Sequence, residues 1–306
     1  RDCLLSRGLG DVYKRQKIER ADGRLRLQGK IRMYAEESPG SFIRLFYEKL
    51  VLESAVEWCK EEVNSHISWK KDVTLPAEGY RIRVTPERII VEAADDAGFI
   101  YAIQSLRQWN TGEERGLIFP CVEITDFPRV KWRSFMLDSG RQYQKVSTIK
   151  KYIDMASMLK MNYFHWHLTE GLGWRIEIKR YPFLTRIGAF VGQGPEQQGF
   201  YSQEEVKEII GYAADRGITV VPEIDMPGHA EAALNAYPRL GCFNVAVKVP
   251  QSGFTQNIFC AGKDSTLIFL KNVLDEVCRM FPSAYIHLGG CLLYTSPSPR
   301  DKRQSR

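Results

Sequence analysis

From Lys131 onwards, short apolar stretches alternate with amphipathic helical patterns, and this alternation constrains the fold more than any other feature of the chain. The expected strands are residues 133–138 (RSFMLD), 163–169 (YFHWHLT), 219–225 (TVVPEID) and 285–290 (YIHLGG). Repeated strand–helix units imply a parallel sheet that is covered on both faces. Four such units make half of an eight-stranded barrel. A doubly wound open sheet is the alternative, but no glycine-rich phosphate loop follows any of these strands.

The helices expected between these strands have clear boundaries. Residues 145–160 place their apolar side chains on one stripe at helical spacing. Ser202 opens a capping box, Ser-Gln-Glu-Glu, and the helix that follows should end at Gly217. Asp264 begins another helix, which should stop before Pro282. The region 129–290 is therefore predicted to be the N-terminal half of a (β/α)8 barrel of the TIM type.

The residues before this region have a different organisation. Residues 41–63 show a helical pattern, 79–95 contain two alternating β runs joined by Thr-Pro-Glu-Arg, and 95–109 form a second helical pattern. No cluster of chemically useful side chains occurs among them. We expect 17–128 to form a smaller α+β domain whose role is packing.

The two ends of the chain resemble each other more than they resemble the rest. Residues 1–16 and 291–306 each contain Cys-Leu-Leu, Arg-Asp and Lys-Arg-Gln. We interpret both segments as non-native, linker-like sequence and exclude them from the expected fold. They carry +2 and +3 of the net charge of +6, which leaves +1 for residues 17–290. The chain therefore lacks the clustered positive charge that a nucleic-acid partner requires.

The composition excludes further classes of protein. Hydrophobic residues make up 44% of the chain, which is enough to bury a sizeable core. No apolar run approaches the roughly 20 residues that a membrane span needs. The cysteines form no C-x-x-C pair. We therefore expect no membrane span, no zinc or redox centre and no cofactor.

Polar residues gather where the expected strands end, which is the edge that carries the active site in parallel barrels. They are Asp138, Ser139, Gly140 and Arg141 after the first strand, His165, His167, Thr169, Glu170 and Trp174 around the end of the second, Glu223, Asp225 and His229 around the third, and His287 in the fourth. Arg133 lies at the start of the first strand. Aromatic rings beside carboxylate, imidazole and guanidinium groups suit a neutral polyol ligand.

Some of these residues allow two interpretations. His165 and His167 lie on one face of a strand, so they could bind a metal in a metal-dependent barrel hydrolase or could be core histidines. Asp225 could be functional or an ordinary solvated carboxylate. Arg133 could simply pair with Asp138.

Four motifs together carry a specific resemblance. They are WRSFMLDSGR (132–141), HWHLTEGLGWRIEI (165–178), VVPEIDMPGHAEAAL (220–234) and YIHLGG (285–290). In this order and at these distances they resemble glycoside hydrolase family 20, the β-N-acetylhexosaminidases. The resemblance covers nearly all of 131–290 and extends more weakly over about 75–125.

The resemblance implies exo-hydrolysis of terminal β-linked GlcNAc or GalNAc with retention, as in chitobiose breakdown. The 2-acetamido oxygen of the substrate acts as the nucleophile in this family. An Asp orients that group, and the adjacent Glu protonates the leaving oxygen. In the family this Asp-Glu pair follows His-x-Gly-Gly directly, whereas Cys291 and Leu292 follow Gly290 here. We therefore expect a truncated, inactive fragment, with a non-catalytic amino-sugar-binding protein as the alternative.

The resemblance also implies roles for individual residues. Arg133 would bind adjacent sugar hydroxyls, and Glu170 and His229 would form a supporting pair beside the general acid. Cys242 and Cys260 would match a disulfide found in some members, which fits a periplasmic or otherwise exported enzyme. The implied partners are the non-reducing ends of glycans.

Overall fold

The computed structural model describes residues 17–51, 55–112, 116–192, 194–195, 198–247, 249 and 257–290. The linker-like ends, including Cys291 and Leu292, lie outside these residues. The chain divides into two compact units. Unit 1 comprises the residues up to Ser134 with Lys151–Tyr163 and Tyr212–Ile218, and unit 2 comprises the remainder.

Unit 1 contains a seven-stranded sheet in the order β1-β7-β5-β6-β4-β2-β3. Its strands are β1 (Lys17–Leu27), β2 (Ile31–Ala35), β3 (Val56–Trp58), β4 (Ile67–Lys71), β5 (Tyr80–Val84), β6 (Ile89–Ala93) and β7 (Leu117–Asp126). The hairpin predicted within 79–95 is confirmed, because β5 and β6 pair antiparallel with Tyr80 opposite Ala93.

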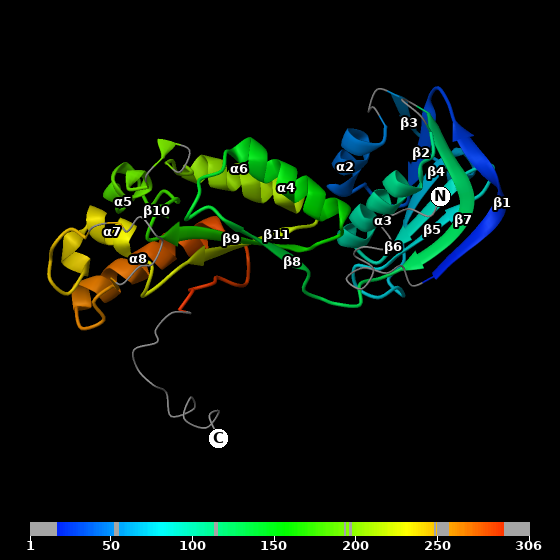
Figure 1. The fold of residues 1–306 in the computed structure, drawn as a ribbon. Helices are drawn as coiled ribbons and strands as arrows, with labels where there is room; N and C mark the ends of the chain where they lie inside the picture. The colour runs from blue at the N-terminus through cyan, green and yellow to red at the C-terminus, as the bar shows by residue number, and fades with distance from the viewer. Residues whose placement is uncertain are drawn as a thin grey trace, which may run out of the picture. The chain divides into compact units, whose positions relative to one another are not determined.

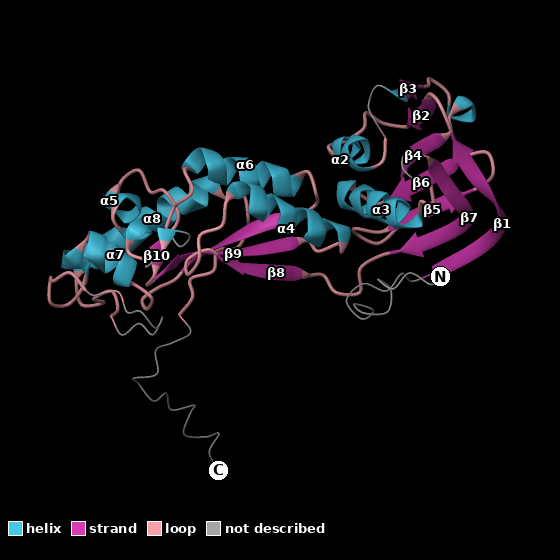
Figure 2. Cartoon of the chain, turned by 45° about the horizontal axis from the view of Figure 1, so that its top comes forward, coloured by secondary structure: helices cyan, strands magenta, loops and turns pink. Residues whose placement is uncertain are grey.

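Two helices, α2 (Phe42–Lys49) and α3 (Asp96–Trp109), cover one face of this sheet (Figures 1 and 2). Asp95 caps α3, since its Oδ1 accepts a hydrogen bond from the Gly98 amide. The predicted helix 41–63 is wrong beyond Lys49, where the chain goes on to β3 and a short 3-10 turn, η2 (Glu62–Asn64). The apolar residues after Lys49 belong to a different element, which the helical pattern did not distinguish.

A buried ammonium group holds part of unit 1 together. Lys160 Nζ donates to Tyr80 Oη at 2.6 Å, to Ser105 Oγ at 2.8 Å and to Asp126 Oδ2 at 3.2 Å. The Lys160 and Asp126 side chains are both almost fully buried. A buried charge of this kind requires its partners, because water cannot replace them.

Unit 2 is built on a four-stranded sheet in which β9 (Tyr163–Glu170) pairs with β8 (Ser134–Asp138), β10 (Gly173–Trp174) and β11 (Thr219–Ile224). The Arg133 carbonyl accepts hydrogen bonds from the amides of Asn162 and Tyr163, and the His167 carbonyl accepts them from Ser139 and Gly140. The start of β8 therefore faces the start of β9, and the two strands run parallel. The predicted succession of parallel strands and helices is confirmed.

Helices follow the strands as predicted (Figure 1). The helices of this region are α4 (Val146–Met158), α5 (Phe183–Arg186), α6 (Gln203–Ala214), α7 (Glu231–Ala236) and α8 (Asp264–Met280), with 3-10 turns η3 (Gly188–Phe190) and η5 (Pro238–Leu240). The capping box of α6 is confirmed, because the Glu205 amide donates to Ser202 Oγ and the Ser202 amide donates to Glu205 Oε2. Within the described residues, no helix combines the length and apolar character needed to cross a membrane.

The fourth predicted strand, 285–290, is shorter than expected. His287 forms a single parallel bridge with Glu223, in which its amide donates to the Pro222 carbonyl and its carbonyl accepts from the Ile224 amide. The segment thus lies beside β11, as a fourth barrel strand would. The arrangement is a partial α/β barrel preceded by a separate sheet.

Candidate active site

The polar residues predicted at the strand ends meet in unit 2, at the carboxyl end of its sheet. Asp138 ends β8 and Arg141 follows it, Glu170 ends β9, and Asp225 and His229 follow β11. Because parallel strands present their carboxyl ends at one edge, residues far apart in the sequence come within contact distance there.

Glu170 lies at the centre of this group and is 1% exposed. Its Oε1 lies 3.0 Å from Arg141 Nη2 and also contacts His229 Nδ1. Its Oε2 accepts a hydrogen bond from the Leu172 amide at 2.9 Å. A buried carboxylate requires such compensation, and the guanidinium, the imidazole and the amide hold it in one position.

Arg141 combines a fixed position with access to ligand. Its backbone amide donates to Asp138 Oδ1 at 2.9 Å, and its guanidinium pairs with both Asp138 and Glu170. Burial disfavours the charged form, but the hydrogen bond to Asp138 and the nearby carboxylates outweigh burial and raise the pKa. The side chain remains 43% exposed, so part of its donor fork is available.

Arg133, in contrast, lies apart from Glu170 and His229. It precedes β8, is 3% exposed and belongs to unit 1. Its guanidinium donates to the carbonyls of Lys160 and Val130, to Glu78 Oε2 and to Tyr101 Oη, over distances of 2.7–2.8 Å. These contacts occupy the guanidinium of Arg133, and its expected binding of sugar hydroxyls stays a prediction. The pairing of Arg133 with Asp138 is wrong, since Asp138 pairs with Arg141.

His229 lies in the turn after β11 with φ +50 and is 9% exposed. Its Nδ1 contacts Glu170, and its Nε2 lies 3.9 Å from Asp225 Oδ2. The imidazole therefore lies between two carboxylates. Glu170 fixes the orientation of the ring, which leaves Nε2 directed towards Asp225.

Asp225 is the second carboxylate at this edge. Burial raises the pKa of its carboxyl group, although the Gly290 amide donates to Oδ1 at 3.2 Å. Gly289 has φ +68, and a Cβ there would lie 1.8 Å from Asp225 Oδ1. Only glycine therefore allows the segment 289–290 to approach this carboxylate so closely.

Three further histidines of unit 2 surround Glu223. His165 Nε2 lies 2.6 Å and His167 Nδ1 2.8 Å from Glu223 Oε2, and His287 Nδ1 lies 3.1 Å from Oε1. His165, Glu223 and His287 also have the donor types of a metal site, as do His167, Glu223 and Asp225. However, the imidazoles contact the carboxylate directly, and these short distances favour a histidine–carboxylate network over a metal centre.

The sequence reasoning missed two buried charged residues that shape this edge. Arg175 donates to the carbonyls of Ser139, Gly140 and Ala189, and burial lowers its pKa to about 10. Glu231 is fully buried, and its Oε1 accepts a hydrogen bond from the Asn257 amide. Burial raises the Glu231 pKa. Their positions in the sequence, directly after Trp174 and two residues after His229, were the available signals.

Cys242 and Cys260 lie close enough for their thiols to share a hydrogen bond, and both are free thiols in the structure. This interaction is the main cause that raises the pKa of Cys242 and lowers that of Cys260. The structure therefore brings together the pair that the resemblance implied.

Comparisons with known proteins identify the family to which this chain is similar. The catalytic-domain model of glycosyl hydrolase family 20 matches residues 130–296, and the model of its domain 2 matches residues 14–127. A beta-hexosaminidase of Porphyromonas gingivalis is 46% identical over 232 residues, covering 72% of this chain and 30% of the relative. A beta-hexosaminidase of Vibrio furnissii is 36% identical over 298 residues, covering 89% and 47%. The chain thus spans less than half the length of these curated relatives.

Solved structures of beta-hexosaminidases are also similar to this chain. A crystal structure of beta-N-acetylhexosaminidase from Bacteroides fragilis has 90% identity and a TM-score of 0.88, covering 96% of this chain and 59% of that one. A Streptomyces plicatus beta-hexosaminidase in complex with its product GlcNAc has 29% identity and a TM-score of 0.83, covering 94% and 60%.

Proposed function

Because the chain belongs to glycosyl hydrolase family 20, we propose that the protein from which it comes is an exo-acting β-N-acetylhexosaminidase. Its substrates would be glycans with a terminal β-linked GlcNAc or GalNAc, cleaved with retention through the 2-acetamido group. The observation that carries the proposal is the contact of Arg141 and His229 with one oxygen of Glu170 at the carboxyl end of the barrel strands.

Each residue of this group has a proposed role. The exposed part of the Arg141 fork would donate to two adjacent sugar hydroxyls, the role that the sequence had assigned to Arg133. Glu170 would hold Arg141 and His229 in place from a buried position. His229 would present Nε2 towards the acid/base position beyond Gly290 and would polarise the groups there.

The acid/base pair itself is not among the 306 residues at the place where the resemblance expects it. Cys291 and Leu292 follow Gly290 in this sequence. We propose that residues 17–128 form the preceding domain, that residues 129–290 carry the sugar-positioning half of the site, and that the 306-residue chain alone has no turnover.

A hybrid protein tests the activity. Residues 17–290 would be joined to the remaining barrel of the 90%-identical Bacteroides fragilis relative and assayed on an aryl β-GlcNAc. We expect turnover of the β anomer only, and a loss of at least about a hundredfold in His229→Gln, because removing a positioned hydrogen-bonding group costs roughly 2.7 kcal/mol or more. An inactive hybrid beside an active relative would contradict the proposal. Turnover by the 306-residue chain that Glu170→Gln abolishes would contradict its inactivity.

A non-catalytic sugar-binding protein is the second candidate, and it requires that Cys291 and Leu292 are native residues of the protein. It predicts GlcNAc binding that depends on Arg141 in the 306-residue chain without any hydrolysis. It also predicts that the source DNA encodes Cys-Leu after Gly290. Sequencing the source DNA across that codon separates the two candidates, since an Asp-Glu reading leaves only the enzyme.

A further inference from the structure

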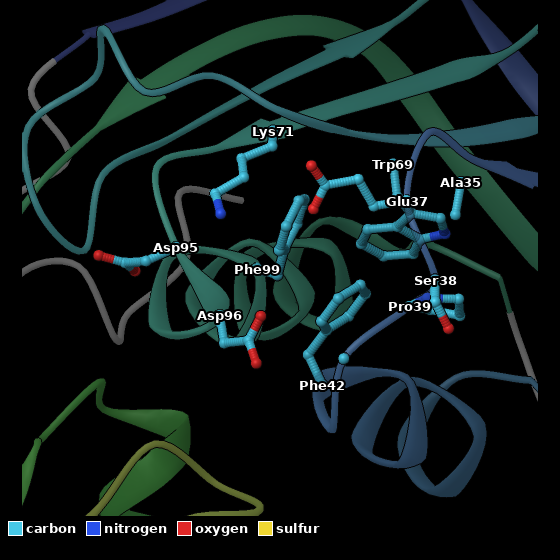
Figure 3. A pocket seen from close by; sticks show the side chains of 11 residues that line it. Ala35, Glu37, Ser38, Pro39, Phe42, Trp69, Lys71, Asp95, Asp96 and Phe99 are labelled. Atoms are coloured by element: carbon cyan, nitrogen blue, oxygen red, sulfur yellow. The ribbon is translucent and has the colours of Figure 1, made fainter.

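Unit 1 contains a cavity that the proposed active site does not use. Its volume is about 290 Å³, and it lies between the end of β2, the end of β4 and the starts of α2 and α3 (Figure 3). This is the lower end of the range of small-molecule sites, roughly 300–1,000 Å³. The cavity therefore has room for one sugar-sized group and not for a longer chain.

The floor of the cavity is aromatic. The ring centroids of Phe42 and Phe99 lie 4.4 Å apart in a stacked arrangement, and Trp69 lies 5.3 Å from Phe42 and 6.0 Å from Phe99. All three rings are largely buried and pack into the core of unit 1. The floor is therefore rigid, which lowers the entropy that binding would cost.

One polar group of this floor has no partner within the described part of the chain. The indole Nε1–H of Trp69 is buried and makes no hydrogen bond, although Trp69 is only 2% exposed. It lies on the side of the ring that faces Ala35, another residue of the cavity wall (Figure 3). Buried donors are almost always paired in native proteins, so this N–H is open to an acceptor that reaches it beside Ala35.

Three charged side chains point towards the same space. Glu37, Lys71 and Asp96 line the cavity, and none of them makes an ion pair with another described residue (Figure 3). A Cβ at Gly40 would lie 2.6 Å from Asp96 Oδ2, so the glycine leaves room for this carboxylate. Asp95 is different, since its oxygens already accept from the amides of Gly98 and Glu78.

We propose that this cavity binds a single sugar residue of a glycan, at a site separate from Glu170 and His229. The three carboxylates, including the hydrogen-bonded Asp95, disfavour an anion, Lys71 disfavours a simple cation, and the charged side chains together disfavour an apolar ligand. A sugar satisfies all of them without net charge, because its hydroxyls both donate to carboxylates and accept from an ammonium or an indole N–H. Its C–H face packs on the aromatic wall.

The Trp69 indole signal provides the test. The 306-residue chain, which has six tryptophans, would be labelled with [15N]tryptophan, and Trp69→Phe would identify the Trp69 resonance. We expect N-acetylglucosamine, added to tens of millimolar, to shift this resonance with millimolar affinity. Asp96→Asn and Lys71→Met should each weaken binding by about tenfold, the cost of one charge-assisted hydrogen bond.

Matched controls keep the result specific. Glu87→Gln changes an exposed carboxylate on the β5–β6 turn and should leave the affinity unchanged, and thermal melting would confirm that all the variants at exposed positions are folded. Arg141→Met should also leave the Trp69 shift intact, since it alters only the proposed active site. The absence of a Trp69 shift with the sugar would overturn the proposal. Glycine, a zwitterionic probe, would be titrated in parallel, and a shift with glycine alone would overturn it as well.

Discussion

Arg141 Nη2 lies 3.0 Å from Glu170 Oε1, and the same oxygen contacts the imidazole of His229. One buried carboxylate thus holds a guanidinium from the end of β8 and a ring from the turn after β11. The guanidinium and the imidazole give this buried carboxylate the polar partners that its burial requires. This relationship distinguishes the candidate active site from an accidental gathering of polar residues at a sheet edge.

The two arginines that flank β8 should respond differently to the same substitution. Arg141→Met should lower the free energy of unfolding by about 1–3 kcal/mol, because it removes one partner of the buried Glu170 carboxylate, and should weaken GlcNAc binding by at least about tenfold. Arg133→Met should lower the free energy of unfolding by about 2–4 kcal/mol, because Glu78 and two backbone carbonyls lose their hydrogen-bond donor. The affinity of the folded protein for GlcNAc should stay unchanged.

Urea unfolding and calorimetric titration with GlcNAc measure the two effects. If Arg133→Met abolished binding in a fully folded protein, the original assignment of the hydroxyl-binding role to Arg133 would be restored.

Lys160 should be essential for the stability of unit 1. Lys160→Met leaves the buried carboxylate of Asp126 without its ammonium partner, which should cost about 3–5 kcal/mol. Adding Asp126→Leu removes the stranded charge, so the double variant should recover much of the loss. Denaturant unfolding followed by tryptophan fluorescence would measure both. A single variant as stable as the parent would show that the ammonium contributes nothing.

The histidines around Glu223 should make stability depend on pH in both directions. Burial opposes ionisation of Glu223, but its contacts with His165 and His167 outweigh burial and lower its pKa. Burial likewise opposes the charged form of His167, yet Glu223 and the nearby aspartates raise its pKa above the ordinary 6.5. The stabilisation by Glu223 is present above its ordinary pKa of 4.5 and is lost as the pH falls through its lowered value.

The stabilisation by His167 is present below 6.5 and is lost as the pH rises through its raised value. The network should therefore contribute most between pH 4.5 and 6.5. Melting temperatures recorded from well below pH 4.5 to well above pH 6.5 should show a maximum within this window, and Glu223→Gln should remove most of it. An unchanged pH profile in the variant would mean that the network does not couple to folding.

Cys242 and Cys260 should form a disulfide under oxidising conditions, because their thiols already lie within hydrogen-bonding distance. Mild oxidation should remove the mass of two hydrogens and raise the free energy of unfolding by about 3 kcal/mol. Cys278→Ser, at an exposed free cysteine, should not alter either effect. Peptide mapping that finds Cys242 linked to any other cysteine would refute this pairing.

The sequence alone determined the local elements and the kind of site. Period-two stretches predicted β5 and β6, short apolar stretches predicted β8, β9 and β11, and the Ser202 capping box predicted the start of α6. These signals depend only on neighbouring residues. The same order of motifs indicated the family and brought attention to Glu170 and His229. Where neighbouring residues allowed two structures, as in 41–63, the sequence pattern failed.

Only the tertiary structure decided which residues meet. Arg133 and Arg141 flank one strand and carry the same side chain, so nothing local distinguishes them. The packing of unit 1 buries Arg133 against Glu78 and Tyr101, while the carboxyl end of the sheet places Arg141 against Glu170. The unpartnered indole of Trp69 likewise became visible only in the packed core. Charge pairing and burial depend on contacts between residues distant in the sequence, and these contacts exist only once the chain has folded.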